Sequence, residues 1–492
     1  MENTMKLKEI IREDEISYLK LSPDTEVTGL AMKARDVKDG FVYIVTNEEK
    51  ADYESLNGTP AAIICKTGAK APSEYESITE RCEDPLRLAA FAYARLCQTD
   101  LDRIKFIGIT GTNGKTTTSV MLKKILTDSG CRVGYVGTGK IESCGKVLSD
   151  NYYSMTTPEP DVLYPKIKEL VDDGCEIIIM EVSSHALKLS RVAPLRFEYG
   201  IFTNLSPEHG DFHPDMEDYF LAKSKLMKMS KTGVFNLDDS YSRRAAREFC
   251  GRKITTGVLW KGDVYARDIE SFGFSGIGYV YRAKNFSFMM RLRLSGIFNI
   301  YNSMMALAVA IDMGILPCKA KESLASLYKV DGRFEVTNGD VTVVIDYAHT
   351  PIGFENILKS LNSLKKSRQK LCVVFGCGGE RDKQKRPLMA SIAERYADTV
   401  YVTCDNPRGE NPESIINDIL DGFTEKSYIC EPDRAIAIRR AILTAHSGDI
   451  VAVIGKGAEK YSIDKNGYHP FDEKKIISDA LREREVQNDY RP

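Results

Sequence analysis

The amino-acid sequence predicts an α/β protein with three domains, and three observations support this expectation. The chain has 492 residues, which is too long for a single core because domains usually contain about 100–200 residues. Short apolar runs that indicate buried strands alternate with helical patterns along most of the chain. One of these runs ends in a Gly-rich turn that opens a helix. Alternation of this kind is typical of parallel sheets covered by helices on both faces.

A small α/β domain is expected over residues 1–98, a domain with a parallel sheet over 99–328, and a second, Rossmann-like sheet over 329–492. The apolar runs that predict strands lie at 41–45, 61–65, 106–109, 132–136, 176–180, 199–203, 341–345, 371–375, 399–402 and 450–454. In open sheets of this kind, sites form at the carboxyl ends of the strands. The residues that follow the strands are therefore the first candidates for function.

The composition indicates a soluble globular protein, because 43% of the residues are hydrophobic and 28% are charged. A net charge of -2 gives no argument for a nucleic-acid partner. The 12 cysteines form no C-x-x-C pair and are expected to be reduced thiols. The N-terminus has no apolar signal region, and no run approaches the roughly 18 apolar residues of a membrane span. We expect a cytoplasmic monomer without membrane insertion.

The Gly-rich turn after the apolar run 106–109 is the most informative motif. Its sequence is Gly111-Thr112-Asn113-Gly114-Lys115-Thr116-Thr117. A strand, a glycine turn and a helix N-terminus place backbone N–H groups around an anion. Lys115 can then reach the outer phosphates of a nucleotide, and the hydroxyl of Thr116 can ligate Mg²⁺. The motif is a short variant, G-x-x-G-K-T, and it predicts the use of ATP or GTP; a solvated Gly/Thr turn is the alternative.

Two other strand ends carry acidic and imidazole side chains. Glu181 follows the run 176–180 and can hold the Mg²⁺ that bridges nucleotide phosphates, although a solvated glutamate at a strand end is equally compatible with the pattern. The run 199–203 leads into a segment with four titratable residues, Glu208, His209, Asp211 and His213. Three of the six histidines of the chain lie in these two segments, namely His185 shortly after Glu181, and His209 and His213. They indicate a second metal position, with a polar surface loop as the alternative.

These motifs and several more occur in the order found in the Mur ligases, and the chain most resembles their MurE type. The motifs are Gly111 to Thr118, Glu181-Val182-Ser183-Ser184-His185, Thr203-Asn204-Leu205-Ser206, Tyr219-x-x-Ala222-Lys223, Asn299-x-x-Asn302, Gly332-Arg333-x-Glu335, Asp346-Tyr347-Ala348-His349-Thr350-Pro351 and Gly376-Cys377-Gly378-Gly379. The resemblance covers about residues 100–480. It is weaker in the first hundred residues, where Lys33-Ala34-Arg35 stands in place of the family's Asp-Ser-Arg.

The resemblance implies an ATP- and Mg²⁺-dependent ligase of peptidoglycan precursor synthesis. Such an enzyme phosphorylates a carboxylate of UDP-MurNAc-L-Ala-D-Glu, and the amine of the incoming amino acid attacks the acyl phosphate. By resemblance, Lys115, His209, Lys223 and Arg333 are catalytic. Thr116, Glu181, His209 and Lys223 hold the metal, with Lys223 converted to a carbamate.

The resemblance also assigns binding residues. The nucleotide is expected to contact the turn from Gly111 to Thr117 and four further residues, Asn299, Asn302, Arg333 and Asp346. Asn299 and Asn302 would face the adenine, although an N-cap role for Asn299 is the structural alternative. Arg333 would reach the phosphates when the C-terminal domain closes, and Asp346 would lie near the ribose. Substrate contacts are implied for Thr156, Thr157, Ser183, Arg191 and His349.

A final motif concerns the amino acid that is added. Asp405-Asn406-Pro407-Arg408 is similar to the motif of MurE enzymes that take meso-diaminopimelate rather than L-lysine. Diaminopimelate has a distal carboxylate that lysine lacks, and an arginine can bind it with two hydrogen bonds. Arg386, Gly455 and Glu459 resemble other residues of that pocket. An ordinary Asn-Pro turn is the alternative.

Three functional alternatives stay open at this point. The chain could add L-lysine or another amino acid, or it could act on a carrier other than the UDP-MurNAc-dipeptide. It could also be a nucleotide-gated binding or scaffold protein that has lost ligation. The presence of Lys115, Glu181, His209, Lys223 and Arg333 argues against the last alternative, because a binding protein has no need for a second metal position.

Overall fold

The computed structural model describes residues 4–17, 20–47, 51–150, 156–425 and 428–489. The chain divides into two compact units, each assembled from separate stretches of sequence. The first unit contains Met1–Thr110, Cys131–Gly200 and Ala222–Lys231, and the second contains Gly111–Gly130, Ile201–Leu221 and Thr232–Pro492. The three-domain boundaries expected from the sequence stay a prediction.

The first unit contains three groups of strands, of which the smallest is the antiparallel pair β1–β2. Its elements are β1 (Met5–Lys6), α1 (Leu7–Ile10), β2 (Glu26–Val27), β3 (Gly29–Ala31), β4 (Phe41–Ile44), β5 (Ala62–Lys66), β6 (Thr79–Cys82), α2 (Pro85–Leu96), β7 (Lys105–Thr110), β8 (Val133–Gly137), β9 (Lys140–Ser143), β10 (Lys146–Asp150), α4 (Pro160–Asp172), β11 (Ile177–Glu181) and α5 (Ser184–Lys188). Strands β3 to β6 form a parallel four-stranded sheet in chain order. The third group runs in the order β10-β9-β8-β11-β7. In it β8, β11 and β7 are parallel, whereas β9 and β10 form an antiparallel hairpin.

Three elements cross the boundary between the units along the chain, namely β12 (Phe197–Phe202), α6 (Met216–Lys228) and β13 (Ser230–Asn236). The second unit continues with α3 (Lys115–Asp128), α7 (Ser240–Glu248), β14 (Arg252–Gly257), β15 (Val264–Ser271), β16 (Ile277–Arg282), β17 (Ser287–Leu292), α8 (Phe298–Asp312) and α9 (Pro317–Ser326). Here β13, β14 and β15 pair in parallel, and β15, β16 and β17 form an antiparallel ribbon.

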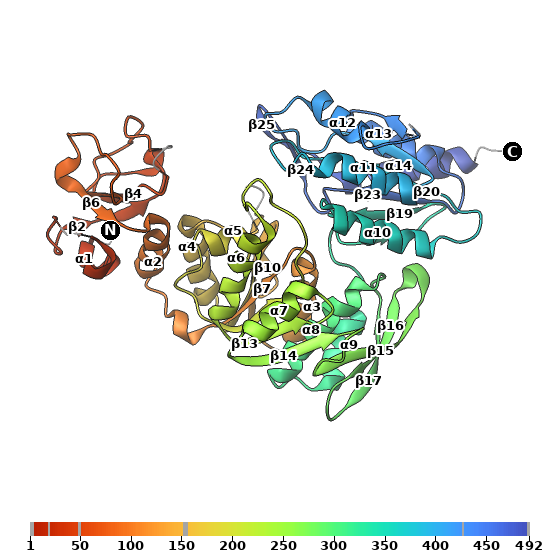
Figure 1. Cartoon of the computed structure of the whole chain (residues 1–492), viewed down its shortest axis with the longest axis horizontal. Coiled ribbons are helices and arrows are strands. Elements are labelled where there is room, and N and C mark those ends of the chain that lie inside the picture. Colours follow the sequence, from red (N-terminus) through yellow and green to blue (C-terminus); the bar gives the residue numbers. More distant parts are fainter. Residues whose placement is uncertain (1–3, 18–19, 48–50, 151–155, 426–427, 490–492) are drawn as a thin grey trace. The chain divides into compact units, whose positions relative to one another are not determined.

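The C-terminal part of the second unit is a six-stranded sheet between two layers of helices (teal to blue in Figure 1). Its elements are β18 (Glu335–Thr337), β19 (Thr342–Asp346), α10 (Pro351–Leu364), β20 (Leu371–Phe375), α11 (Lys385–Tyr396), β21 (Thr399–Val402), α12 (Pro412–Leu420), β22 (Tyr428–Cys430), α13 (Arg434–Thr444), β23 (Ile450–Ile454), β24 (Tyr461–Asp464), β25 (Gly467–Pro470) and α14 (Glu473–Asp489). The strand order is β18-β19-β23-β20-β21-β22, and all pairs except β18–β19 are parallel.

The two faces of this sheet follow from the alternation of side chains along its strands. Helices α10, α11 and α12 pack on one face, where Val373 and Ile454 point. Helices α13 and α14 pack on the other face, where Val374 and Val453 point. Because both faces are buried, the central strands β20 and β23 are apolar throughout, as is typical of parallel sheets.

The predicted fold class is confirmed, and so are most of the predicted strands. The runs 371–375, 399–402 and 450–454 match β20, β21 and β23 at both ends. The antiparallel elements were not predicted: β9–β10, β15–β17 and β24–β25. Strands β15, β17 and β25 expose several side chains, and β9 and β16 mix polar or charged residues with apolar ones, so these strands lack the continuous apolar signal of the buried parallel strands.

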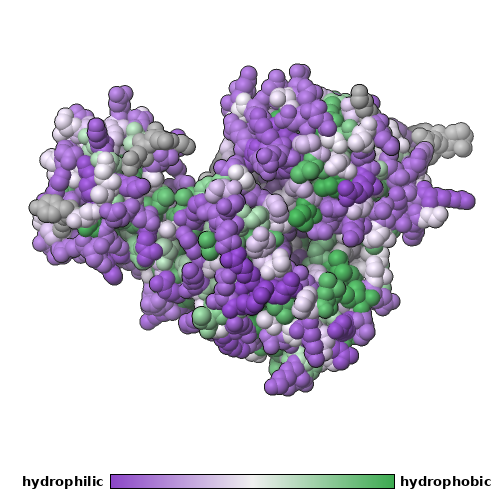
Figure 2. Space-filling model, in the orientation of Figure 1, coloured by the Kyte–Doolittle hydropathy of each residue, from purple (hydrophilic) through white to green (hydrophobic). Residues whose placement is uncertain are grey.

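No helix among the described residues is long and apolar enough to cross a membrane. The visible face in Figure 2 carries hydrophilic residues interspersed with smaller hydrophobic groups. Single exposed apolar side chains, such as Leu259 and Tyr328, are common on globular proteins.

Candidate functional site: a phosphate loop and two strand-end clusters

The Gly-rich turn follows β7 and opens α3, and its backbone requires two of its glycines. Gly111 has a φ of 142° and Gly114 a φ of 85°, which L side chains rarely adopt. A Cβ atom on Gly111 would lie 1.9 Å from Thr203 Oγ1, and one on Gly114 would lie 2.5 Å from Asn302 Oδ1. Glycine at both positions thus allows the backbone to pack closely against two other segments. Helix α3 then begins at Lys115, with the N-terminal N–H groups that favour an anion.

The segment after β12 holds this turn in place. Asn204 accepts a hydrogen bond from Thr112 N through its carbonyl oxygen and one from Asn113 N through Oδ1, both at 3.0 Å. Its Nδ2 donates back to Asn113 O at 3.0 Å, as does Thr203 Oγ1 at 2.7 Å. Ser206 N donates to Thr112 Oγ1 at 3.0 Å. The motif at 203–206 therefore supports the phosphate loop, a role that the sequence did not reveal.

The predicted phosphate-binding side chains lie together in the second unit. Lys115 Nζ donates to the carbonyl oxygens of Gly111 and Thr112, each at 2.9 Å. Arg333 Nη2 donates to Thr116 Oγ1 at 3.1 Å. Residues separated by more than two hundred positions thus meet at the start of α3. Two cationic side chains at a helix N-terminus form an environment suited to phosphates.

The two asparagines predicted to face the adenine lie beside the phosphate loop on α8. Asn302 Oδ1 accepts from Thr118 Oγ1 at 3.3 Å, and Asn302 Nδ2 donates to Asn299 Oδ1 at 3.3 Å. Both asparagines are buried, as is Thr117 on α3. The N-cap of α8 is Ile297, so the capping alternative for Asn299 is wrong. The adenine contact itself stays a prediction.

Asp346, at the end of β19, is bound by the backbone on both sides. Its Oδ2 accepts from Phe334 N at 2.6 Å and its Oδ1 from Ala348 N at 2.7 Å. Burial raises the pKa of this carboxyl, and the nearby charge of Arg333 opposes the rise only in part. Asp346 therefore fixes the segment that carries Arg333 to the end of β19, whether or not it also meets a ribose.

Glu208 is a largely buried carboxylate that the sequence placed in a titratable cluster but did not select. Its Oε1 lies 2.9 Å from His349 Nε2, and its Oε2 accepts from the hydroxyl of Tyr219 at 3.3 Å and lies 3.6 Å from His209 Nε2. Burial alone would raise the pKa of Glu208. The charges of His209, His349 and Lys115 outweigh burial and hold the pKa well below its ordinary value. Glu208 thus connects the predicted catalytic residue His209 with the predicted substrate residue His349.

In the first unit, Glu181 ends β11 with its side chain fully buried. The hydroxyl of Tyr135 donates to Glu181 Oε1, and Thr138 Oγ1 lies 3.2 Å from Glu181 Oε2. Thr138 Oγ1 also lies 3.1 Å from Thr156 Oγ1. The sequence did not single out Tyr135 or Thr138. Their hydroxyls fix the orientation of the carboxylate that is predicted to hold Mg²⁺.

The predicted substrate residues of this unit surround the same strand end. Thr157 Oγ1 donates to Glu181 O at 2.8 Å and accepts from Ser183 N at 3.0 Å. Arg191 Nη1 donates to Thr157 O at 3.0 Å, and Ser183 caps α5. Thr156, Thr157, Ser183 and Arg191 therefore form one cluster, as expected if all four serve one ligand.

Lys223 is an almost fully buried lysine on α6, with a relative exposure of 2%. Glu181 and Lys223 belong to the first unit, and Thr116 and His209 to the second. Among the described ranges, no group of three or more histidine, cysteine, aspartate or glutamate side chains could hold a metal ion. A carbamate on Lys223 would supply an oxygen ligand, which the unmodified ammonium group cannot do.

Most of the residues predicted to bind the amino acid follow β21 and β23, two parallel strands of the C-terminal sheet with β20 between them. Lys456 Nζ lies 3.2 Å from Asp405 Oδ1 and donates to Asn406 Oδ1 at 2.6 Å. Asn406 Nδ2 donates to Glu459 Oε2 at 3.0 Å. Gly455 has a φ of 126°, and a Cβ atom there would lie 3.1 Å from Asp405 Oδ2. The structure thus brings these predicted residues together around Lys456, which the sequence did not select.

The two carboxyls of this cluster have opposite pKa shifts. For Asp405, burial raises the pKa, but the charges of Lys456 and Arg434 outweigh burial and lower it below the ordinary value. For Glu459, burial and the charge of Asp405 raise the pKa above its ordinary value. Asp405 therefore stays ionised, and Glu459 binds a proton more readily than an exposed glutamate would.

Arg408 lies at the edge of this cluster, and its own backbone is unusual. Its φ is 52°, and its backbone N donates to Ile463 O at 3.0 Å. Its Nη1 donates to Gly379 O at 2.8 Å. A Cβ atom on Gly379 would lie 1.9 Å from Pro407 O, so glycine allows the two loops to touch. The guanidinium of Arg408 is thereby held beside the loop that contains Gly379.

Arg386 occupies a different environment, because its side chain is fully buried among acids. Its Nη1 and Nη2 each lie 3.0 Å from one oxygen of Glu410, and its Nη1 lies 2.7 Å from Asp418 Oδ2. Its Nη2 also donates to Gly378 O at 3.3 Å. A contact of Arg386 with diaminopimelate stays a prediction. The geometry assigns it a structural role in holding the loop around Gly378.

The ion pair of Arg386 and Glu410 predicts a pH-dependent stability. The hydrogen bonds from Arg386 lower the pKa of Glu410 to about 2. Because the folded-state pKa lies below the unfolded one, this stabilisation is complete above about pH 4.5 and is lost as the pH falls toward 2. The Glu410→Gln variant should be about 2 kcal/mol less stable than wild type at neutral pH. Urea unfolding of both proteins should show that difference narrowing below about pH 4.5; a constant difference would contradict the assignment.

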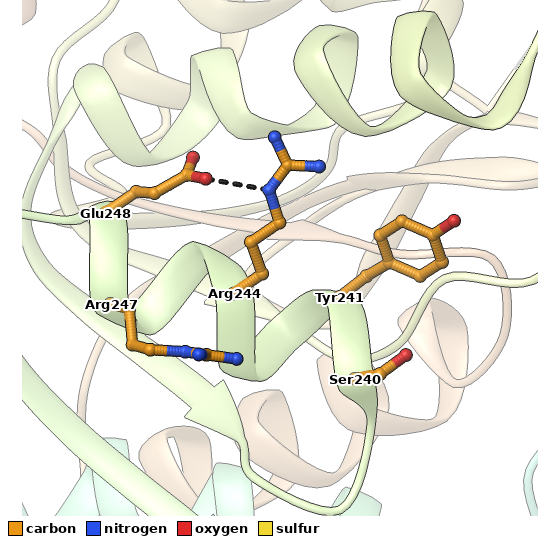
Figure 3. A pocket seen from close by; sticks show the side chains of 5 residues that line it. All are labelled: Ser240, Tyr241, Arg244, Arg247 and Glu248. Carbon is orange, nitrogen blue, oxygen red and sulfur yellow. Dashed lines mark hydrogen bonds and ion pairs between the residues drawn. The ribbon is translucent and has the colours of Figure 1, made fainter.

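A surface cavity of about 410 Å³ is lined by residues other than those predicted for function. It is lined by Ser240, Tyr241, Arg244, Arg247 and Glu248, all from α7 (Figure 3). Arg244 Nε donates to Glu248 Oε1 at 2.7 Å, and both of its terminal nitrogens donate to Glu217. Its guanidinium is therefore engaged by the protein itself.

Comparison with known proteins gives the same family as the motifs. The family model described as "Mur ligase middle domain" matches residues 109–310, and that of "Mur ligase, glutamate ligase domain" matches residues 332–457. Two relatives are named as UDP-N-acetylmuramoyl-L-alanyl-D-glutamate–2,6-diaminopimelate ligases. The one from Clostridium acetobutylicum is 36% identical over 97% of this chain and 100% of its own length. The one from Aquifex aeolicus is 38% identical over 92% of this chain and 94% of its own.

Solved structures agree with this result. A structure of a UDP-N-acetylmuramoyl-L-alanyl-D-glutamate–2,6-diaminopimelate ligase is 28% identical, has a TM-score of 0.66, and covers 98% of this chain and 99% of its own. The MurF ligase of Thermotoga maritima in complex with ADP shares the fold at 18% identity and a TM-score of 0.61, over 93% and 98% of the two chains. The chain therefore belongs to the Mur ligase family.

Proposed function

We propose that this protein is the ATP-dependent ligase that adds meso-diaminopimelate to UDP-MurNAc-L-Ala-D-Glu in peptidoglycan precursor synthesis. The observation that carries the proposal is the braced phosphate loop, with Lys115 Nζ folded over it and Arg333 at Thr116. This loop occurs in a chain that is related over nearly its whole length to proteins named as diaminopimelate-adding ligases.

The chemistry proceeds in two steps. The γ-phosphoryl group of ATP passes to a carboxylate oxygen of the dipeptide and gives an acyl phosphate and ADP. The amine of diaminopimelate then attacks the acyl carbon, phosphate leaves, and an amide forms. Phosphoryl transfer depends mainly on positioning and on neutralisation of charge. Lys115 and Arg333 supply positive charge at the helix N-terminus for the first step.

Mg²⁺ fits the oxygen donors that the chain presents. The Glu181 carboxylate is oriented by neutral hydroxyl donors, and carboxylate and hydroxyl oxygens are the ligands that Mg²⁺ prefers. By resemblance to the family, the residues that would hold Mg²⁺ are Thr116, Glu181, His209 and the carbamate of Lys223. Bound Mg²⁺ would neutralise charge on the phosphates.

Carbamylation of Lys223 gives a direct test of the metal assignment. A buried ammonium is costly, and a carbamate would replace it with an anion that can bind Mg²⁺. In buffer with ¹³C-bicarbonate, the protein should show a carbamate carbon signal by NMR. The Lys223→Ala variant should lose that signal and most of its activity. Lys228→Ala, an exposed lysine on the same helix, should keep both; a signal that survives in Lys223→Ala would refute the assignment.

The choice of diaminopimelate rests on the cluster after β21 and β23. A distal carboxylate requires a cation, and Arg408 lies at the edge of this cluster. A distal ammonium requires an acid, and Asp405 stays ionised there. Bound lysine would leave the guanidinium of Arg408 without an anionic partner, and this disfavours lysine as the substrate.

The deciding experiment measures phosphate release from ATP and Mg²⁺ with UDP-MurNAc-L-Ala-D-Glu. Meso-diaminopimelate and L-lysine are supplied in separate reactions, and the product is identified by mass. Release with diaminopimelate alone supports the proposal. Phosphate release with L-lysine alone would indicate that the protein adds lysine instead. Release with neither, from protein that binds ATP, would indicate a different carrier.

A further inference from the structure

Two cysteine thiols from separate elements of the first unit lie in contact. Cys144 is in the turn between β9 and β10, and Cys175 lies two residues before β11. Their Sγ atoms are 3.6 Å apart. Cys144 is exposed, whereas Cys175 is buried. Neither residue belongs to the predicted site, so the proposed function gives no reason for the pair.

The backbone of the β9–β10 turn positions Cys144 beside Cys175. Cys144 and Gly145 have φ values of 48° and 88°, and the ladder pairs Ser143 with Lys146. This is a two-residue turn with positive φ at both positions, which favours Asn-Gly rather than cysteine. Cys144 N donates to Val133 O at 3.0 Å. Formation of the bond requires the two Sγ atoms to move from 3.6 Å to about 2.05 Å apart.

We propose that Cys144 and Cys175 form a reversible intramolecular disulfide by exchange with a low-molecular-weight disulfide. The thiolate of Cys144 attacks one sulfur of that disulfide, which gives a mixed disulfide and releases one small thiol. The thiolate of Cys175 then attacks Sγ of Cys144, the protein S–S bond forms, and the second small thiol leaves. The two cysteines lose two electrons, the small disulfide gains them, and the thiol protons pass through solvent to the released thiolates.

The order of the two steps follows from exposure. Of the two cysteines in the pair, Cys144 is the one exposed to a reagent in solution. Burial and the adjacent Cys144 raise the pKa of the Cys175 thiol, and its contact with Ser143 lowers it only in part. Cys175 is therefore a poor first nucleophile and serves as the resolving thiol, in contact with the sulfur it must attack.

The bond would tie the β9–β10 turn to the start of the strand that ends at Glu181. It would close a loop between positions 31 residues apart. Such a link removes conformational freedom from the unfolded chain. Oxidised protein should therefore unfold a few degrees higher than reduced protein.

The test treats the native full-length protein with glutathione disulfide, blocks the remaining thiols by alkylation, and maps peptides by mass spectrometry. Wild type should give a peptide cross-linked between Cys144 and Cys175 that dithiothreitol removes. Cys175→Ser should instead accumulate glutathione on Cys144, because the resolving thiol is gone. Cys144→Ser should give neither product at this pair. The exposed Cys250 and Cys318 serve as internal controls and should carry only glutathione.

Two results would overturn the proposal. One is stable glutathione on Cys144 of wild type without the cross-link. The other is a cross-link that appears only after denaturation. Reduced Cys144→Ser and Cys175→Ser should retain the circular dichroism and the unfolding temperature of reduced wild type. If either variant fails to fold, the wild-type map and its comparison with Cys250 still decide the question.

Discussion

Replacement of Lys115 by alanine is expected to lower kcat by about 10³-fold or more while the protein keeps its fold. The ammonium group lies over the phosphate loop, within 2.9 Å of two of its carbonyl oxygens. In the proposed reaction it neutralises charge on the group that is transferred, and no neighbouring residue can replace it from the same position on α3. The loop itself is held by Asn204, so its shape should persist in the variant. Phosphate release and circular dichroism would check the two parts of this result.

Lys124→Ala is the matched control for this variant. It removes the same charge from the same helix, at a residue whose ion pair is with Asp128. Its activity should stay close to wild type, because surface ion pairs contribute little. Wild-type turnover in Lys115→Ala would remove the phosphate-loop assignment, and a similar loss in both variants would indicate a general effect of charge.

Replacement of Arg408 by alanine is expected to lower kcat/KM for meso-diaminopimelate by about 10²-fold, with little change in the residual use of L-lysine. The guanidinium is held by Gly379 O, so its position is set before the substrate arrives. A distal carboxylate that loses this partner would be buried beside Asp405 without compensating charge. The ratio of the two amino acids in competition, read from the product masses, gives the specificity directly.

Arg395→Ala serves as the control for Arg408. Arg395 is an exposed arginine of α11 that pairs with Glu355. The Arg395→Ala variant should leave both the rate of ligation and the ratio of the two products unchanged. If Arg408→Ala keeps the wild-type preference for diaminopimelate, the amino-acid pocket lies elsewhere. Loss of activity with both amino acids would show that Arg408 supports the loop rather than the choice of substrate.

The buried strands were predictable because their signal is local. Strand β20 is apolar along its whole length and ends at a glycine, so both its type and its end follow from adjacent residues. Strand β11 is apolar up to its last residue, Glu181, so its type was predictable, although the predicted run 176–180 is displaced by one residue from the strand Ile177–Glu181. The ribbon β15–β17 was not predictable in this way. Residues 267–271 of β15 are exposed, and its pairing depends on strands that the chain reaches later.

The candidate site residues divide in the same way. Glu181 ends a strand and Lys115 follows the turn after one, so both were selected from the sequence. Glu208 and His349 are 141 positions apart, and nothing in either segment specifies the other. Lys456 was quoted within a motif but not selected, because its partner Asp405 lies on a different strand end. Such pairs arise from the order of strands in the sheet, which a pattern of single residues does not encode.

The bracing of the phosphate loop by Asn204 also has a consequence for affinity. A flexible glycine turn would lose conformational entropy each time a nucleotide bound, and that loss would weaken binding. Here the amide of Asn204 restrains Asn113 from both its donor and its acceptor sides. The entropy is therefore lost once, when the chain folds, and each binding event begins from an ordered anion cradle. A change at Asn204 should weaken nucleotide binding without removing any contact to the nucleotide.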